Sequence, residues 1–351
     1  MKKQLFYAAW LLALAAGAFC VWRFSSPSAP TQKQAALPAA TSAPEPMVAL
    51  LNEPLLPLPA IPDLDPRKVA LGKRLFHDPR LSKNNTISCA SCHNIKTMAG
   101  ADGRKLSLGI EGALGKVNAP TVFNSGLNFK QFWDGRAATL EEQVHGPVTN
   151  SLEMGAQWPD VIAKLSQDAD YVAEFKTSYG EGAITPDMIT DAIAVFERSL
   201  VTPSRFDRYL LGDKTALTPR EQEGYRLFKE HGCVACHQGV SIGGNMFQTM
   251  GKMADYFGDR GNITESDMGR YNVTKDDRDK YKFKVPGLRN VALTPPYFHD
   301  GNAATLEEAI QTMAKYQLGA AFTDEEVGLI IEFLKSLNGE YDGKPLEKSS
   351  E

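Results

Sequence analysis

Cysteine and histidine are scarce in this sequence, with only five and six among its 351 residues. A surplus of basic charge is missing as well, because 38 Lys and Arg against 42 Asp and Glu leave a net charge of −4. That balance gives no case for a nucleic-acid partner. No strand-rich region is present either, so we expect a mainly α-helical protein. The length leaves room for about two domains.

Four of the five cysteines lie in two copies of one short motif. Residues 89–93 (CASCH) and 233–237 (CVACH) both read C-x-x-C-H, the attachment signature of a c-type haem. One copy could arise by chance or form half of a zinc site, but two copies that use four of five cysteines indicate two covalently bound haems. The two thiols of each motif bond to the haem, and the histidine is the proximal iron ligand. The predicted haem residues are Cys89, Cys92 and His93, and Cys233, Cys236 and His237.

The first residues predict an export signal. Two lysines follow Met1, and an uncharged apolar run extends from Leu5 to Trp22. This run is long for a cleaved signal peptide and just long enough to span a bilayer. We therefore expect an uncleaved signal anchor over residues 1–24 that tethers the protein to the inner membrane, with a cleaved signal peptide as the alternative. Either signal places the body in the periplasm, outside the bacterial cytoplasm, where haem is attached to C-x-x-C-H.

An internal repeat divides the body of the chain. Each haem motif follows a helical segment, LGKRLF (71–76) or EGYRLF (223–228), and FWDGRAATLEE (132–142) is echoed by FHDGNAATLEE (298–308). The repeat predicts two cytochrome c-like domains, each with one covalently bound haem. The second carries an insertion around residues 245–285. The expected divisions are a Pro/Ala-rich linker 25–62, an N-terminal haem domain 63–203, a C-terminal haem domain 204–342 and a polar tail 343–351.

These motifs together resemble one protein family. From about Asp65 to Gly339 the chain resembles the bacterial di-haem cytochrome c peroxidases, and more loosely the di-haem enzyme MauG. The pieces that carry the resemblance are LGKRLFHDPRLS, ISCASCHN, NAPTVFN, QFWDGRAATLEEQ, GCVACHQG and PGLRNVALTPPYFHDG. The resemblance implies an enzyme that reduces hydrogen peroxide to water, with electrons from a small c-type cytochrome or a cupredoxin.

The resemblance also implies different roles for the two haems. The N-terminal haem, on His93, is the peroxidatic site, and the C-terminal haem, on His237, is a high-potential electron store with Met313 as its second axial ligand. A methionine thioether raises the haem potential and fills the sixth coordination site. Methionine is also a common filler of protein cores, and the competing candidates for this ligand are Met246, Met250 and Met253.

Further matched positions surround the haems. Trp133 corresponds to a tryptophan that lies between the two haems and shortens the distance for electron tunnelling, although it is also a plausible core aromatic. Gln143 and Glu153 correspond to the polar pair at the peroxidatic iron. There a carboxylate takes a proton from one peroxide oxygen and returns it to the other. Without the resemblance, Glu153 would be read as a solvated loop acid.

A metal ion and a second copy of the chain are implied in the same way. Asn118, Thr294 and Pro296 correspond to positions that hold a calcium ion between the domains, the last two through backbone carbonyls. His299 is expected to hydrogen bond to a haem propionate or across the domain interface. Family members are often homodimers, so we expect a homodimer.

The chain departs from the family opposite His93. Many members carry a distal histidine that blocks the peroxidatic iron until the other haem is reduced. The aligned residue here is Ile110, and no histidine lies between His93 and His145. Because isoleucine cannot bind iron, we expect an open N-terminal haem, either five-coordinate or water-bound. The alternatives are a partner-supplied ligand or a cap from Glu111, Met98 or a distant histidine.

Two other classes of function stay open. A MauG-like enzyme would oxidise residues of a partner protein, but MauG has a tyrosine as distal ligand of its second haem, where this chain offers Met313. A non-enzymatic di-haem protein for electron transfer or peroxide sensing would not need the pair Gln143 and Glu153.

Overall fold

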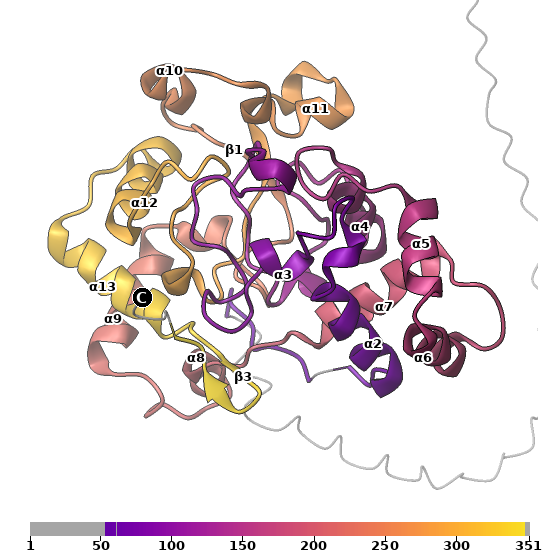
Figure 1. Ribbon diagram of the computed structural model, residues 1–351. Coiled ribbons are helices and arrows are strands. Elements are labelled where there is room, and N and C mark those ends of the chain that lie inside the picture. Colours follow the sequence, from indigo (N-terminus) through magenta and orange to yellow (C-terminus); the bar gives the residue numbers. More distant parts are fainter. Residues whose placement is uncertain (1–52, 61, 348–351) are drawn as a thin grey trace, which may run out of the picture. The chain divides into compact units, whose positions relative to one another are not determined.

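The computed structural model of the protein describes residues 53–60 and 62–347 (Figure 1). The predicted signal segment 1–24 and most of the predicted linker lie outside these residues. Within them the chain is mainly helical with long loops and short strands, as expected. Across this described part, no helix is both long enough and apolar enough to cross a membrane.

The elements follow one another along the whole described chain. The helices are α2 (Pro66–Phe76), α3 (Cys89–Cys92), α4 (Leu140–Thr149), α5 (Trp158–Ser166), α6 (Ala169–Tyr179), α7 (Pro186–Ser199), α8 (Arg205–Leu210), α9 (Pro219–Glu230), α10 (Tyr256–Arg260), α11 (Tyr271–Thr274), α12 (Leu306–Met313) and α13 (Asp324–Lys335). The strands are β1 (Phe247–Thr249), β2 (Lys282–Lys284), β3 (Glu340–Tyr341) and β4 (Lys344–Pro345). Strand β1 pairs antiparallel with β2, and β3 pairs antiparallel with β4.

The internal repeat appears in the structure as two similar helix crossings. Helix α2 packs on α7, and α9 packs on α13 (Figure 1). At the first crossing Gly72 faces the backbone of Ala192, and at the second Gly224 faces the backbone of Leu329. A Cβ atom at either glycine would come within 1.9 Å of the opposing carbonyl oxygen. The glycines shared by LGKRLF and EGYRLF therefore allow each helix pair to approach closely.

Several helix starts agree with their sequence signals, and one motif differs in detail. Thr218 and Thr323 each begin the sequence pattern of a capping box, with a glutamate three residues later, and both form capping boxes at α9 and α13. In the motif TLEE the Thr139 hydroxyl accepts from Glu142 N at 3.2 Å. The Glu142 carboxylate, however, accepts from Ala138 N at 2.7 Å rather than from the cap residue itself. The glutamate thus bonds to the residue before the cap and not to the cap residue of a standard capping box. The equivalent motif before α12 has the same arrangement, with Glu308 accepting from Ala304 N.

Two large hydrophobic cores lie within the described residues. The first is built from residues between Leu71 and Leu200. The second is built from residues between Phe206 and Leu337, together with Leu55, which is 0 % exposed. These cores support two cytochrome c-like domains. The boundary between residues 203 and 204 stays a prediction.

The two ends of the described chain pack on opposite cores. Leu55 belongs to the second core, although the N-terminal haem domain follows it in sequence. Tyr341 and Leu346 pack against the first core, although they come last. Residues 53–60 and 343–347 therefore differ from the free linker and the free polar tail that composition predicts.

The predicted insertion forms a small cluster of its own. Tyr256, Phe257 and Phe283 are its buried residues, and Trp133 packs against them. The hairpin of β1 and β2 lies at the base of this segment, with Gln248 opposite Phe283. The insertion thus contacts the aromatic residue that the sequence places between the haems.

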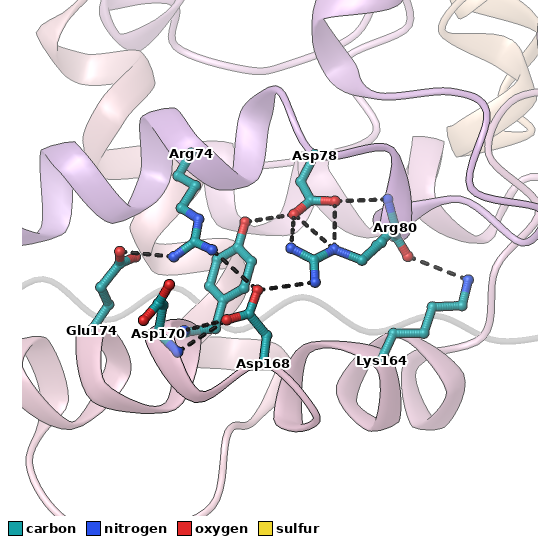
Figure 2. Close-up of polar contacts among 8 residues, drawn as sticks. Arg74, Asp78, Arg80, Lys164, Asp168, Asp170 and Glu174 are labelled. Carbon is teal, nitrogen blue, oxygen red and sulfur yellow. Dashed lines mark hydrogen bonds and ion pairs between the residues drawn. The ribbon is translucent and has the colours of Figure 1, made fainter.

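A polar network fastens helix α6 to the segment after α2 (Figure 2). Buried Asp78 accepts hydrogen bonds from the Arg80 guanidinium and, at 2.7 Å, from the Tyr171 hydroxyl. Arg74 and Arg80 each lie 3.1 Å from Asp168, and the Arg74 guanidinium stacks over the Tyr171 ring at 3.8 Å. Such charge-assisted bonds fix the outer side of the first core.

Candidate haem sites and the region between them

The first haem motif begins with a single helical turn, α3. His93 follows this turn, and its Nδ1 atom lies 3.2 Å from the carbonyl oxygen of Gly100. Because a carbonyl only accepts, Nδ1 is the protonated nitrogen and Nε2 is left for iron. Burial lowers the pKa of His93, which keeps the ring neutral as a ligand requires.

The second motif has the same arrangement. Cys233–Ala235 forms a short turn, and Nδ1 of His237 lies 3.4 Å from the Ile242 carbonyl oxygen. Burial lowers the pKa of His237 to about 4. The cysteines of both motifs are free. The thiols and imidazoles present therefore fit two covalently attached haems.

A cavity of about 450 Å³ opens on the second motif. Its walls include Cys233, Cys236, His237 and Met313, and most of its lining is apolar. Helix α12 ends at Met313 and continues into a π-helical turn, a geometry frequent at functional sites. Met250, one of the competing methionines, also lines the cavity. The cavity suits a flat apolar cofactor with Met313 as the predicted axial ligand.

Trp133 lies on the wall of this cavity and is held from both halves of the chain. Its indole Nε1 donates to the Asn118 carbonyl at 2.9 Å, and its own carbonyl accepts from Lys284 N at 2.8 Å. Its ring meets His299 edge to face, with 6.4 Å between the ring centroids. Trp133 thus lies at the second haem motif. The bridging role itself stays a prediction.

The three residues predicted to hold calcium line the same cavity. Asn118, Thr294 and Pro296 all line the cavity. The Asn118 amide nitrogen donates to the Arg104 carbonyl at 2.8 Å. The amide oxygen is therefore the side-chain atom that suits a hard cation.

The distal residues of the first haem come together in one tight contact. Ile110 is 7 % exposed, and its N–H donates to the Glu153 carbonyl at 2.8 Å. A Cβ on Gly109 would come within 2.0 Å of the Leu152 carbonyl oxygen, so only glycine allows this approach. The Glu153 carboxylate accepts from the Asn150 side chain at 2.7 Å.

The Glu153 carboxylate also lies within electrostatic range of the first haem motif. Burial raises the pKa of the Cys92 thiol, and the charges of Asp102 and Glu153 act in the same direction. Half-buried Gln143 lies on α4, the helix that leads into the Glu153 loop. The structure therefore brings Ile110 and Glu153 together, with the Glu153 charge near Cys92, and the distal roles of Ile110, Glu153 and Gln143 stay predictions.

The alternative caps for the first haem differ in their surroundings, and Met98 is half-buried. Glu111 is exposed, with φ +57°. The histidines outside the haem motifs have local partners: His77 bonds to the Lys73 carbonyl, His145 packs on Trp158, His231 stacks on Phe322, and His299 pairs with Asp267. The Nε2 atom of His299 therefore bonds within the second half, and the propionate or interface bond of this ring stays a prediction.

Sequence reasoning missed a charged cluster beside Trp133. The carboxylates of Asp267 and Asp300 and the ring of His299 lie close enough together to resemble a metal site. The Arg260 guanidinium, however, pairs with both carboxylates. The cluster is therefore an internally satisfied ion network. His299 and Asp300 are neighbours in sequence, but Asp267 lies 32 residues before His299, so no local spacing predicts the cluster.

A second missed group is the carboxyl of Glu197 on α7. This residue is 7 % exposed, and burial raises its pKa to about 8. After burial itself, the charge of Glu197 is the next largest cause that raises the pKa of Cys89, so the acid lies near the first haem motif. The available signal was its position on the apolar face of the helix, four residues after Ile193 and three before Leu200.

Replacing this acid is expected to change how stability depends on pH. The folded-state pKa of Glu197 is raised to about 8 from an ordinary 4.5, so between these values the folded protein holds a proton that the unfolded chain releases. Stability therefore falls as pH rises through this window, by up to ~1.4 kcal/mol per pH unit. The Glu197→Gln variant should lack this loss. Urea unfolding of holoprotein across the window measures it, with exposed Glu340→Gln as control, and equal pH slopes for all three proteins would contradict it.

Comparison with known proteins agrees with this geometry. The sequence model of the di-haem cytochrome c peroxidases matches residues 66–215. The chain is 51 % identical over 292 residues to the cytochrome c peroxidase Ccp of Escherichia coli K12, covering 83 % of this chain and 62 % of that relative. It is 47 % identical over 294 residues to the cytochrome c551 peroxidase of Nitrosomonas europaea, covering 84 % and 86 % of the two chains.

Solved structures show the same relationship. A MauG-like protein associated with microbial copper homeostasis superposes with a TM-score of 0.70 at 32 % identity, over 81 % of this chain and 93 % of that one. The di-haem peroxidase BthA of Burkholderia thailandensis, at 23 % identity and a TM-score of 0.65, shares the fold over 78 % of this chain and 86 % of its own. From these relatives and its paired haem motifs, the chain belongs to the di-haem cytochrome c peroxidase family.

Proposed function

We propose that the protein reduces hydrogen peroxide to two waters with two electrons and two protons. A small c-type cytochrome or a cupredoxin supplies the electrons. The observation that carries the proposal is the placement of Glu153, a carboxylate held at the first haem motif by the loop of Ile110. Relatives at 42 % identity or more bear the names cytochrome c peroxidase or cytochrome c551 peroxidase.

The protein's own residues divide the work at the first site. The bound haem supplies an iron that binds peroxide and passes electrons to it. Glu153 takes a proton from one peroxide oxygen and returns it to the other, and the Asn150 amide at 2.7 Å orients its carboxylate. Gln143 orients the substrate from α4. Glu153 thus transfers the proton, and Asn150 and Gln143 position the carboxylate and the substrate.

The second site receives electrons. His237 and Met313, which line one cavity, would hold the second haem. Trp133 carries electrons between the two halves, and its bonds to Asn118 and Lys284 keep the ring in place. Cavity walls with few exposed polar groups favour the high potential that an electron store needs.

We also propose that the first haem is open before any electron arrives. Ile110 stands where a distal histidine would be required, and an aliphatic side chain cannot bind iron. Its backbone is already tied to Glu153, and the loop closes on Leu152 through Gly109. The resting enzyme is therefore expected to react without prior reduction.

Stopped-flow mixing of the fully oxidised protein with peroxide tests this expectation. A fast absorbance change of the N-terminal haem is expected, together with a high-spin signal in the electron paramagnetic resonance spectrum of the resting protein. A low-spin six-coordinate N-terminal haem with no fast reaction would show that another group caps the iron. Steady-state turnover after reduction would then still test the peroxidase proposal separately.

A MauG-like reaction on a partner protein has less support. Relatives named methylamine utilization protein MauG are 32 % and 33 % identical, below the peroxidase relatives. Met313 on the second cavity also favours an electron-store haem over the tyrosine-ligated haem of MauG.

The remaining assignments complete the proposal. A calcium ion is held by the Asn118 side chain and the carbonyls of Thr294 and Pro296, which line the same cavity. The protein acts in the periplasm as a homodimer, tethered by the segment 1–24. The C-x-x-C-H motifs and the apolar run Leu5–Trp22 support this location.

A further inference from the structure

Lys284 is a buried cation on the wall of the second haem cavity. It ends strand β2 and lines the same cavity as His237 and Met313. The residue is only 8 % exposed, so most of its side chain is shielded from bulk water, unlike that of a surface lysine. Burial lowers its pKa to about 8.

Within the described part of the chain, no residue pairs with the Lys284 ammonium. Lys282, two residues earlier on the same strand, shows the ordinary arrangement, because its ammonium lies 2.7 Å from Asp279. For Lys284, burial is the sole cause of the pKa shift, with no opposing charge or hydrogen bond. An unpaired buried ammonium is strongly unfavourable, so this residue calls for an anionic partner.

The cavity is the place where that partner fits. Among its described lining residues there are three basic side chains and no aspartate or glutamate. Arg289 is already bound to Asp207 at 2.9 Å, and Lys252 is exposed. Lys284 is therefore the buried cation in this lining whose charge is left to pair with a molecule bound in the cavity. An occupant with an apolar body and carboxylates at its edge matches these walls, and haem with its propionates has this chemistry.

We propose that the Lys284 ammonium binds a propionate carboxylate of the second haem and thereby raises the midpoint potential of that haem. This inference rests on the proposed haem site. A fixed positive charge near the iron favours the reduced state, which carries one positive charge less. The backbone N–H of Lys284 donates to the Trp133 carbonyl at 2.8 Å. The strand that carries the cation thus also holds the aromatic ring beside the haem.

Spectroelectrochemical titration of the holoprotein tests the proposal. In Lys284→Met the potential of the second haem should fall by at least about 59 mV, a tenfold change in the ratio of reduced to oxidised haem for one electron. Lys284→Arg keeps the charge and should restore most of the difference. The control Lys282→Met removes a charge from the same strand but not from the cavity, and it should match the wild type. The potential of the first haem should be unchanged in all variants.

The outcomes separate this inference from the proposed function. If Lys284→Met binds both haems and keeps the wild-type potential, the inference is wrong, while the peroxidase proposal stands. If Lys284→Met fails to retain haem, Lys284→Gln decides by the same titration, because it keeps a polar side chain without the charge. A wild-type protein without a second haem would overturn the proposed function itself.

Discussion

The Glu153→Gln protein is expected to turn over peroxide two to four orders of magnitude more slowly than the wild type, with both haems still attached. A positioned acid–base group contributes roughly 10²–10⁴-fold to such a reaction. Glutamine keeps the size of the side chain and can still bond to Asn150, which lies 2.7 Å from the carboxylate. It cannot take a proton from peroxide. The loss should therefore appear in turnover and not in folding.

Steady-state peroxide consumption with a reduced cytochrome measures the effect, and the haem absorbance per protein reports attachment. Glu111→Gln is the matched control, because that acid lies on the neighbouring loop but is exposed. Wild-type turnover in Glu153→Gln would remove this residue from the mechanism. An equal loss in Glu111→Gln would point to the charge of the loop rather than to proton transfer.

The second large effect concerns stability. Asp207→Asn is expected to lower the free energy of unfolding by about 3–5 kcal/mol, because it leaves the Arg289 guanidinium buried without its anion. Both residues are almost fully buried and are joined by two hydrogen bonds of 2.9 Å. Asp207 also accepts from Leu58 N at 2.8 Å, and Arg289 donates to the Leu56 carbonyl at 3.1 Å. The pair thus fastens the N-terminal arm to the second core.

Urea unfolding at equal haem content measures this change. The exposed pair Arg220 and Glu325, 3.1 Å apart, provides the control. Glu325→Gln should lower the free energy of unfolding by less than about 1 kcal/mol, since exposed ion pairs contribute little. Similar values for the two variants would show that burial does not strengthen the Asp207–Arg289 pair.

Local chemistry made much of the fold predictable. The haem residues lie in contiguous motifs, so Cys89, Cys92 and His93 need no knowledge of the fold. Thr218 and Thr323 announced the starts of α9 and α13 because a helix cap is decided within four residues. The joint placement of His237 and Met313 on one cavity followed from the repeat and the family resemblance.

Long-range pairings were not predictable in the same way. Asp207 and Arg289 are separated by 82 residues, and neither position differs in sequence from an ordinary surface charge. Lys284 is informative because its partner is missing, which only a three-dimensional arrangement can reveal. The burial of Glu197 could be detected in the sequence, because this residue falls on the apolar face of helix α7. A buried charge can thus be predicted from sequence only where the helical periodicity of apolar residues includes its position.

Each end of the described chain packs on the core of the other half, and this arrangement has a consequence for biosynthesis. The Tyr341 ring packs at a tilt on Phe123, with 5.2 Å between the ring centroids, and Leu346 packs on the same first core. These two residues are synthesised after the second half, so the half that is synthesised first cannot complete its packing until the second half has been made. The first core therefore waits for a late segment of the chain, whereas the second core takes Leu55 from a segment that is made early.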